Sequence, residues 1–80
     1  MNTDLLIKMA NEISEFFAGA SEPQQAARDV AAHLRRYWEP RMRAQIISYC
    51  AERHGAGLTD LARHGVELLQ AESAGQGSRA

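Results

Sequence analysis

Apolar residues recur every three to four positions along most of this 80-residue chain, and no stretch alternates as a half-buried strand does. On a helical wheel, the large apolar side chains of residues 4–18, with the exception of Ile7, fall within an arc of about 140°. The same holds for residues 23–38, whose apolar face begins with small alanines and ends with Tyr37 and Trp38. Pro40 ends this helix, because proline disfavours helical backbone at the residue before it. The pattern therefore predicts an all-α fold.

Two further helices are expected after Pro40, which can itself open a helix in its first turn. The third helix, roughly residues 40–53, carries two separate apolar strips, one of which contains Ile47. The fourth follows a glycine-containing turn and has Thr59 as its expected N-cap. Gly65 lies inside this helix at a cost of about 1 kcal/mol relative to Ala. We therefore expect its missing side chain to make room for a neighbouring helix.

The predicted architecture is a single small bundle of three to four short helices. It spans residues 1–72, and a disordered tail, residues 73–80, follows because that stretch has no apolar period. The chain is too short for a cofactor-binding α/β domain or a barrel. A domain of this size buries only about 60% of the surface of its unfolded chain, so a partner surface would help to stabilise it.

Charge and composition exclude several classes of protein. Nine Lys and Arg against ten Asp and Glu give a net charge of −1, which provides no overall attraction to nucleic acid or to an anionic membrane. The single Cys cannot form an internal disulfide, as expected in a reducing compartment. No apolar stretch approaches the ~20 residues of a membrane span, and the N-terminus lacks the basic stretch of a signal peptide. We expect a cytoplasmic protein.

Residue pairs that resemble reactive sites have simpler explanations. Cys50 and His54 are spaced i, i+4 and could share a metal ion, but a structural zinc site needs four ligands. His33 and Asp29, spaced in the same way, are explained by a surface ion pair. No Ser or Cys nucleophile with a nearby base can be argued from the sequence. We therefore predict no catalytic, cofactor-binding or metal site in this chain.

Residues 33–43, here called the elbow, are the most informative segment. Four arginines and two adjacent aromatic residues surround a proline, and Arg with Tyr and Trp is typical of protein interfaces. We expect a partner interface formed by Tyr37, Trp38, Pro40, Arg41, Met42, Arg43 and Ile47. The alternative is a small helical DNA-binding regulator, in which arginines near a helix start would meet phosphates or base edges.

Several strings in the chain are distinctive when taken together. They are Leu6-Ile7-Lys8-Met9-Ala10-Asn11-Glu12-Ile13, Phe16-Phe17, His33-Leu34 with Tyr37-Trp38-Glu39-Pro40-Arg41-Met42-Arg43, and Gly57-Leu58. Over roughly residues 5–70, the chain resembles the delta subunit of soluble NAD-dependent formate dehydrogenase. The resemblance implies a small non-catalytic subunit of a cytoplasmic complex that oxidises formate to carbon dioxide with NAD.

The same resemblance implies where the cofactors of that complex lie. The large alpha subunit would carry the molybdenum cofactor, a bis-molybdopterin guanine dinucleotide, and iron–sulfur clusters, while beta and gamma subunits pass electrons to FMN and NAD. One Cys cannot hold a cluster that takes four thiolates, so we expect this chain to bind none of these cofactors. It would support assembly, stability or cofactor insertion, as a permanent subunit or a transient chaperone. The elbow would dock on the large subunit, with Arg41 and Arg43 meeting carboxylates.

Overall fold

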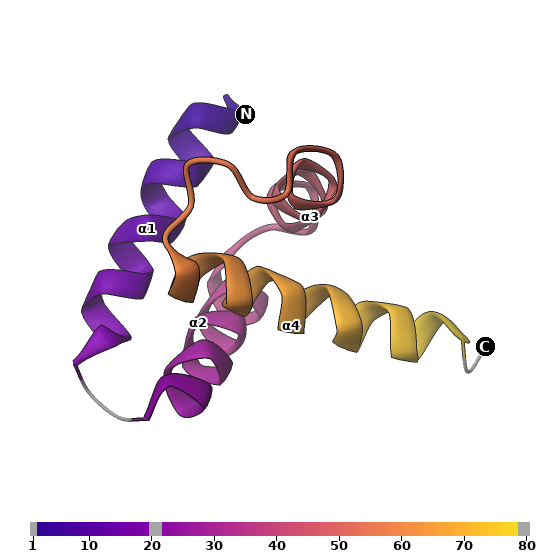
Figure 1. The fold of residues 1–80 in the computed structure, drawn as a ribbon. Helices are drawn as coiled ribbons and strands as arrows, with labels where there is room; N and C mark the ends of the chain where they lie inside the picture. The colour runs from indigo at the N-terminus through magenta and orange to yellow at the C-terminus, as the bar shows by residue number, and fades with distance from the viewer. Residues whose placement is uncertain (1, 20–21, 79–80) are drawn as a thin grey trace.

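The computed structural model contains four α-helices, and it describes residues 2–19 and 22–78, with side chains as far as Glu72. The helices are α1 (Thr3–Ala18), α2 (Pro23–Tyr37), α3 (Pro40–Arg53) and α4 (Asp60–Ser78). In Figure 1, α4 passes across α2, with α1 beside the start of α4 and α3 above its first half. The predicted all-α bundle is confirmed.

The helix ends follow local sequence signals, with one difference. The Asn2 side chain accepts a hydrogen bond from Asp4 N at 2.7 Å, and Thr59 Oγ1 accepts one from Ala62 N at 3.1 Å. The N-cap of α2 is Glu22, which forms no side-chain capping bond, and Pro23 stands in the first turn. Proline at the first helical position leaves one fewer unpaired N–H at the helix start, and its fixed φ favours helical backbone.

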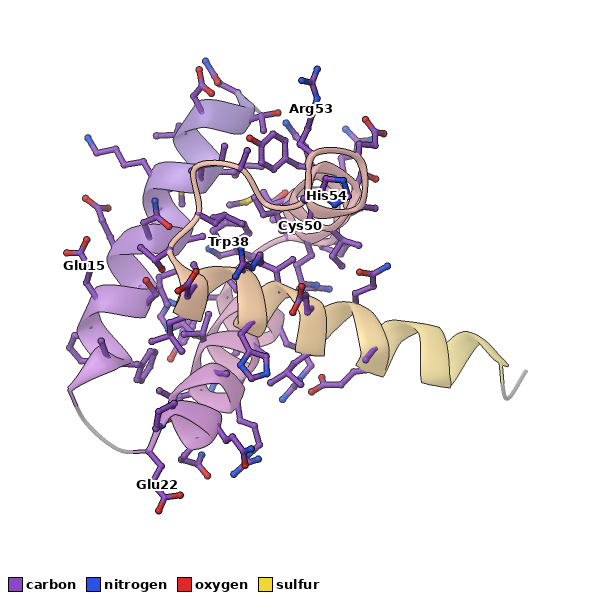
Figure 2. The ribbon with its side chains drawn as sticks, viewed as in Figure 1. Glu15, Glu22, Trp38, Cys50, Arg53 and His54 are labelled. Carbon is purple, nitrogen blue, oxygen red and sulfur yellow. The ribbon has the colours of Figure 1, made fainter. Side chains whose placement is uncertain are left out.

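The core lies where the four helices meet. Trp38 points into the bundle, whereas Glu15, Glu22 and Arg53 project from its surface (Figure 2). Each helix contributes buried apolar residues, together with the two segments between α2, α3 and α4. They are Leu6, Ala10, Val30, Ala31, Leu34, Trp38, Ile46, Leu58, Ala62, Val66 and Leu69.

The most extensive helix–helix contact joins α2 and α4, and it depends on Gly65. A Cβ atom placed on Gly65 would lie 2.5 Å from Val30 Cγ1 and 3.4 Å from the carbonyl oxygen of Ala27. The neighbouring face of α2 is built from small residues, since Ala26 and Ala27 are both buried. The prediction that Gly65 makes room for a neighbour is therefore confirmed, and that neighbour is α2.

The last helix extends beyond the predicted boundary. Backbone in helical geometry continues to Ser78, although residues 73–80 have no apolar period. Side chains beyond Glu72, and all of residues 79–80, lie outside the described part, so the disordered tail stays a prediction. Within the described residues, none of the helices combines the length and the apolar character needed to cross a lipid bilayer.

Replacing Gly65 by Ala should destabilise the protein. The added methyl group would overlap Val30, and overpacking typically costs about 1–3 kcal/mol, more than the ~1 kcal/mol that Ala gains in helix propensity. Chemical denaturation followed by circular dichroism measures the loss. Gly19→Ala is the control, because nothing lies within 4 Å of its added Cβ. The double variant Gly65→Ala with Val30→Ala should lose less free energy of unfolding than the two single variants lose together, because the smaller side chain at position 30 makes room for the added methyl group. Strictly additive losses would contradict this account.

Candidate functional site

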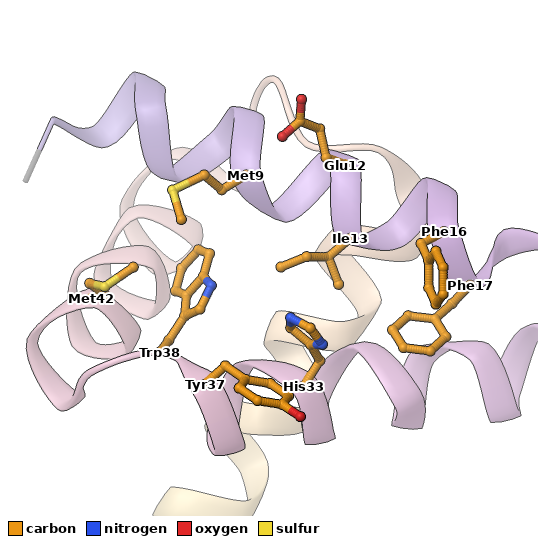
Figure 3. A pocket seen from close by; sticks show the side chains of 9 residues that line it. All are labelled: Met9, Glu12, Ile13, Phe16, Phe17, His33, Tyr37, Trp38 and Met42. Atoms are coloured by element: carbon orange, nitrogen blue, oxygen red, sulfur yellow. The ribbon is translucent and has the colours of Figure 1, made fainter.

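An apolar groove of about 570 Å³ runs along α1 and α2 and reaches the start of α3. At one end Trp38 lies between Met9 and Met42, and at the other end Phe16 and Phe17 close the groove (Figure 3). All nine residues that line it come from these three helices and the α2–α3 connection: Met9, Glu12, Ile13, Phe16, Phe17, His33, Tyr37, Trp38 and Met42. The groove thus includes part of the elbow.

The groove exposes more aromatic surface than the rest of the described chain. Phe16 is 79% exposed and Tyr37 is 66% exposed, whereas Trp38 in the floor is only 5% exposed. The rings of His33 and Tyr37 lie 4.7 Å apart, and Phe17 approaches His33 edge-on at 6.2 Å. This open row of rings is the candidate interaction surface of the chain, because exposed aromatic clusters are uncommon on self-contained monomers.

Arg43 turns back onto the end of α2. Its Nη1 donates hydrogen bonds to the carbonyl oxygens of Trp38 and, at 3.1 Å, of Arg35. These carbonyls end α2, where backbone oxygens lack helical partners and the helix dipole favours a positive charge. These bonds from Nη1 stabilise the bend, and the expectation that Arg43 meets a partner's carboxylate stays a prediction.

The remaining elbow residues separate into two groups. Tyr37, Trp38 and Met42 line the groove, whereas Pro40 begins α3. Arg41 is exposed and has no hydrogen-bond or ion-pair partner within the described residues, so it remains free to meet another chain. Ile47 is half-buried against the core and does not line the groove.

The α1 side of the groove was missed when only the elbow was considered. Met9, Ile13 and Phe16 are spaced i, i+4 and i+7 on α1, which is the spacing of one helix face. A signal was present in the sequence, since adjacent helical residues point about 100° apart, which places Phe16 near the edge of the apolar arc and Phe17 well inside it. Phe17 is half-buried and Phe16 is exposed.

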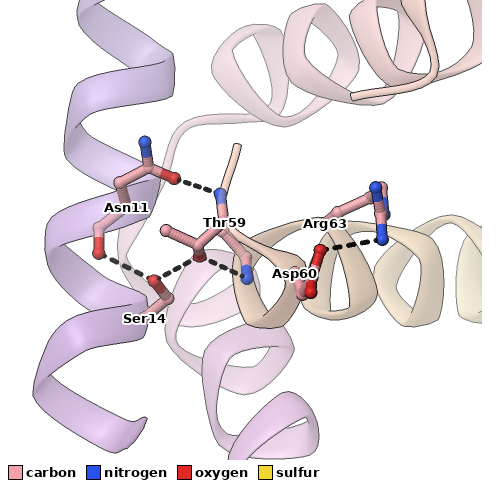
Figure 4. A network of polar contacts seen from close by, with 6 residues as sticks. Asn11, Ser14, Thr59, Asp60 and Arg63 are labelled. Atoms are coloured by element: carbon pink, nitrogen blue, oxygen red, sulfur yellow. Dashed lines mark hydrogen bonds and ion pairs between the residues drawn. The ribbon is translucent and has the colours of Figure 1, made fainter. Parts of the chain in front are cut away.

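A polar network joins α1 to the start of α4 (Figure 4). Asn11 accepts a hydrogen bond from Thr59 N and donates one to Gly57 O, both at 2.9 Å. The buried Ser14 hydroxyl lies 2.8 Å from Thr59 Oγ1 and donates to Asn11 O at 2.7 Å. Each of these groups contacts backbone or another hydroxyl, so the network positions helices rather than activating a nucleophile.

Cys50 is held in a state that disfavours reaction. Burial raises the pKa of its thiol above the ordinary value, the nearby Glu67 carboxylate raises it further, and Arg63 acts in the opposite direction. A raised pKa leaves little thiolate at neutral pH, and the thiolate is the nucleophile and metal ligand. His54 is exposed on the turn after α3. No group of three His, Cys, Asp or Glu side chains in the described chain is placed to hold a metal ion.

The comparison with known families decides the classification. The family model for the NADH-dependent formate dehydrogenase delta subunit, FdsD, matches residues 5–66. The chain belongs to this family. No curated protein and no solved structure matches the chain. The matched range of this FdsD-family chain includes the whole groove and the Asn11–Thr59 network.

Family membership favours the subunit interpretation over a DNA-binding regulator. A regulator that reads DNA with the start of α3 would need Arg41 and Arg43 to face a groove of the duplex. In the FdsD-family chain, Arg43 instead bonds to the end of α2. The resemblance predicted from the sequence is therefore confirmed at the level of the family.

Arg43→Ala should destabilise the chain by about 1–2 kcal/mol, because two carbonyl oxygens at the end of α2 lose a charged donor. Thermal unfolding followed by circular dichroism measures this effect. Arg41→Ala, two residues earlier on the same helix, should stay within about 0.5 kcal/mol of the wild type because Arg41 is exposed and unpaired. Equal effects of the two substitutions would show that the capping bonds contribute nothing.

Asn11→Ala should lower the free energy of unfolding by about 1–2 kcal/mol, since it removes both bonds that hold the α3–α4 loop. Asn11→Asp should cost less, because a carboxylate still accepts from Thr59 N near the positive end of α4. Urea denaturation gives both values, with the exposed Lys8→Ala as control. The proposed clamp fails if Asn11→Ala and Lys8→Ala behave alike.

Proposed function

We propose that this FdsD-family chain is a non-catalytic subunit of a cytoplasmic, NAD-dependent formate dehydrogenase and docks on its large molybdenum-containing subunit. The observation that carries the proposal is the open aromatic groove, within the residues that match the family. Phe16 and Tyr37 expose apolar rings beside a buried Trp38, which is the arrangement of an interface anchor. In this proposal the groove and Arg41 form the docking surface.

The chemistry of the chain supports an accessory role. The polar side chains with the most contacts are engaged in structure: Asn11, Ser14 and Thr59 join α1 to α4, and Arg43 caps α2. A single Cys cannot supply the four thiolates of an iron–sulfur cluster. We therefore assign the molybdenum cofactor, the iron–sulfur clusters, FMN and NAD of the complex to its alpha, beta and gamma subunits.

We assign to the chain a role in assembly, in stability of the complex, or in insertion of the molybdenum cofactor. A small domain with a marginal core gains stability when a partner covers its apolar groove, and the partner gains a covered surface in return. A permanent subunit and a transient chaperone would use the same surface. The stoichiometry of the purified active complex separates these two roles, because a chaperone leaves when assembly is finished.

Co-expression of the tagged chain with the other subunits tests the proposed function. We expect the large subunit to be retained with it at a fixed ratio, with only modest sensitivity to salt, whereas nucleic-acid binding would weaken steeply as salt rises. Arg41→Glu should lower the yield of complex, because a charge at an interface rim steers association. Arg53→Glu, an exposed arginine at the far end of α3, is the matched control. Failure of the wild-type chain to retain any subunit would refute the proposal.

A further inference from the structure

We propose that the groove binds an amphipathic helix from the large subunit, which inserts apolar side chains between Phe16 and Trp38 and offers an oxygen acceptor to the Trp38 indole. This inference rests on the proposed function and deepens it, because it specifies the chemistry of the segment that docks. The partner segment is defined by four properties of the groove: its length, its apolar lining, the indole donor of Trp38 and the charges on its rims.

The length of the groove corresponds to about two helical turns. On α1, Met9, Ile13 and Phe16 present one face over about 10 Å, at 1.5 Å per residue. On α2, His33 and Tyr37 are one turn apart and lie opposite that face (Figure 3). Two such ridges accept a helix whose apolar residues are spaced i, i+3 or i+4, and i+7, as in other complexes where a helix fills a groove. The flexible Met9 side chain can adapt to the shape of the insert.

Trp38 supplies a hydrogen-bond donor, its indole N–H, to the inside of the groove. The residue is 5% exposed, and no described residue accepts a hydrogen bond from its indole Nε1. The nitrogen faces the interior of the groove (Figure 3), where solvent still reaches it, since no fully buried polar side-chain atom of the described chain lacks a partner. An apolar insert would remove that solvent, and an unpaired buried donor costs free energy. The insert must therefore bring an acceptor, such as a carboxylate or amide oxygen.

Opposite charges stand on the two sides of the groove. Glu12 lines the α1 side and is exposed. Arg36 stands beside Tyr37 on the α2 side, with its guanidinium carbon 5.8 Å from the centre of that ring. Neither side chain has an ion-pair partner within the described residues. A helix with a basic residue toward Glu12 and an acidic residue toward Arg36 matches this pattern, and the asymmetry fixes its direction.

Other occupants fit the groove less well. The C-terminal half of α4 runs away from α1, so the end of this helix points away from the groove (Figure 1). A second copy has no apolar ridge to insert, because the large hydrophobic residues exposed in the described chain are Leu5 and the groove's own Phe16 and Tyr37.

Photo-crosslinking in the assembled complex tests the inference. A benzoylphenylalanine at position 16, in the groove, should crosslink to a segment of the large subunit with apolar residues at the stated spacing. The same group at position 5 replaces an exposed Leu outside the groove and should not label that segment.

Phe16→Ala and Trp38→Phe should each raise the dissociation rate of the chain about tenfold, as for interface anchors, while Leu5→Ala stays within about twofold. Trp38→Phe keeps a ring but removes the donor.

The outcomes separate this inference from the proposed function. Suppose that the wild-type chain co-purifies with the large subunit. If the group at position 16 then forms no crosslink, or crosslinks to a second copy of the chain or to a segment without the apolar spacing, the groove assignment is wrong and the proposed function stands. If the wild-type chain does not co-purify, both fail. Arg36→Glu leaves the core untouched and provides a second measurement should Trp38→Phe unfold the chain. It should also speed dissociation, and an unchanged rate would overturn the assigned charge pattern.

Discussion

The close approach of α2 and α4 at Gly65 is the constraint on which the rest of the molecule depends. A side chain there would collide with Val30, so the two helices can meet at this distance only because Gly65 has none. With α4 held against α2, Val66 and Leu69 reach the common core with Leu34. The cost of a glycine inside a helix is thus offset by the apolar area buried between two helices. That contact in turn fixes where α1 and α3 can pack.

Arg43 and Asn11 then fix the two segments that the helix contacts leave free. Arg43 holds the carbonyls at the end of α2, so α3 leaves the bend at a defined angle. Asn11 holds the loop before α4, so the start of that helix stays beside α1. Neither residue contributes apolar area to the core, yet together they determine how α1, α2 and the start of α3 surround the groove. The shape of the groove therefore depends on these polar contacts as well as on the packing of the apolar core.

The sequence predicted the helices, the elbow and the role of Gly65 because these depend on local periodicity, on proline and on helix propensity. It did not predict that Arg43 turns back on α2, since a guanidinium reaches several partners and its choice depends on the angle of the bend. It also did not join Phe16 to Tyr37, because that contact requires the relative placement of α1 and α2. In the sequence, the only sign of the α1 half of the groove is the adjacent pair Phe16 and Phe17.

The distribution of exposed apolar surface shows what kind of protein results. A small domain that functions alone would turn Phe16 inward or replace it by a polar residue, because exposed aromatic side chains promote association. Here the same helix buries Leu6 and Ala10 completely and leaves Phe16 exposed beside Tyr37. The core is therefore formed without these two rings, and folding of the chain alone does not account for their placement. Within the described residues the Trp38 indole N–H also has no acceptor, so the exposed rings and this donor together are the features of the groove that a docking partner would have to satisfy.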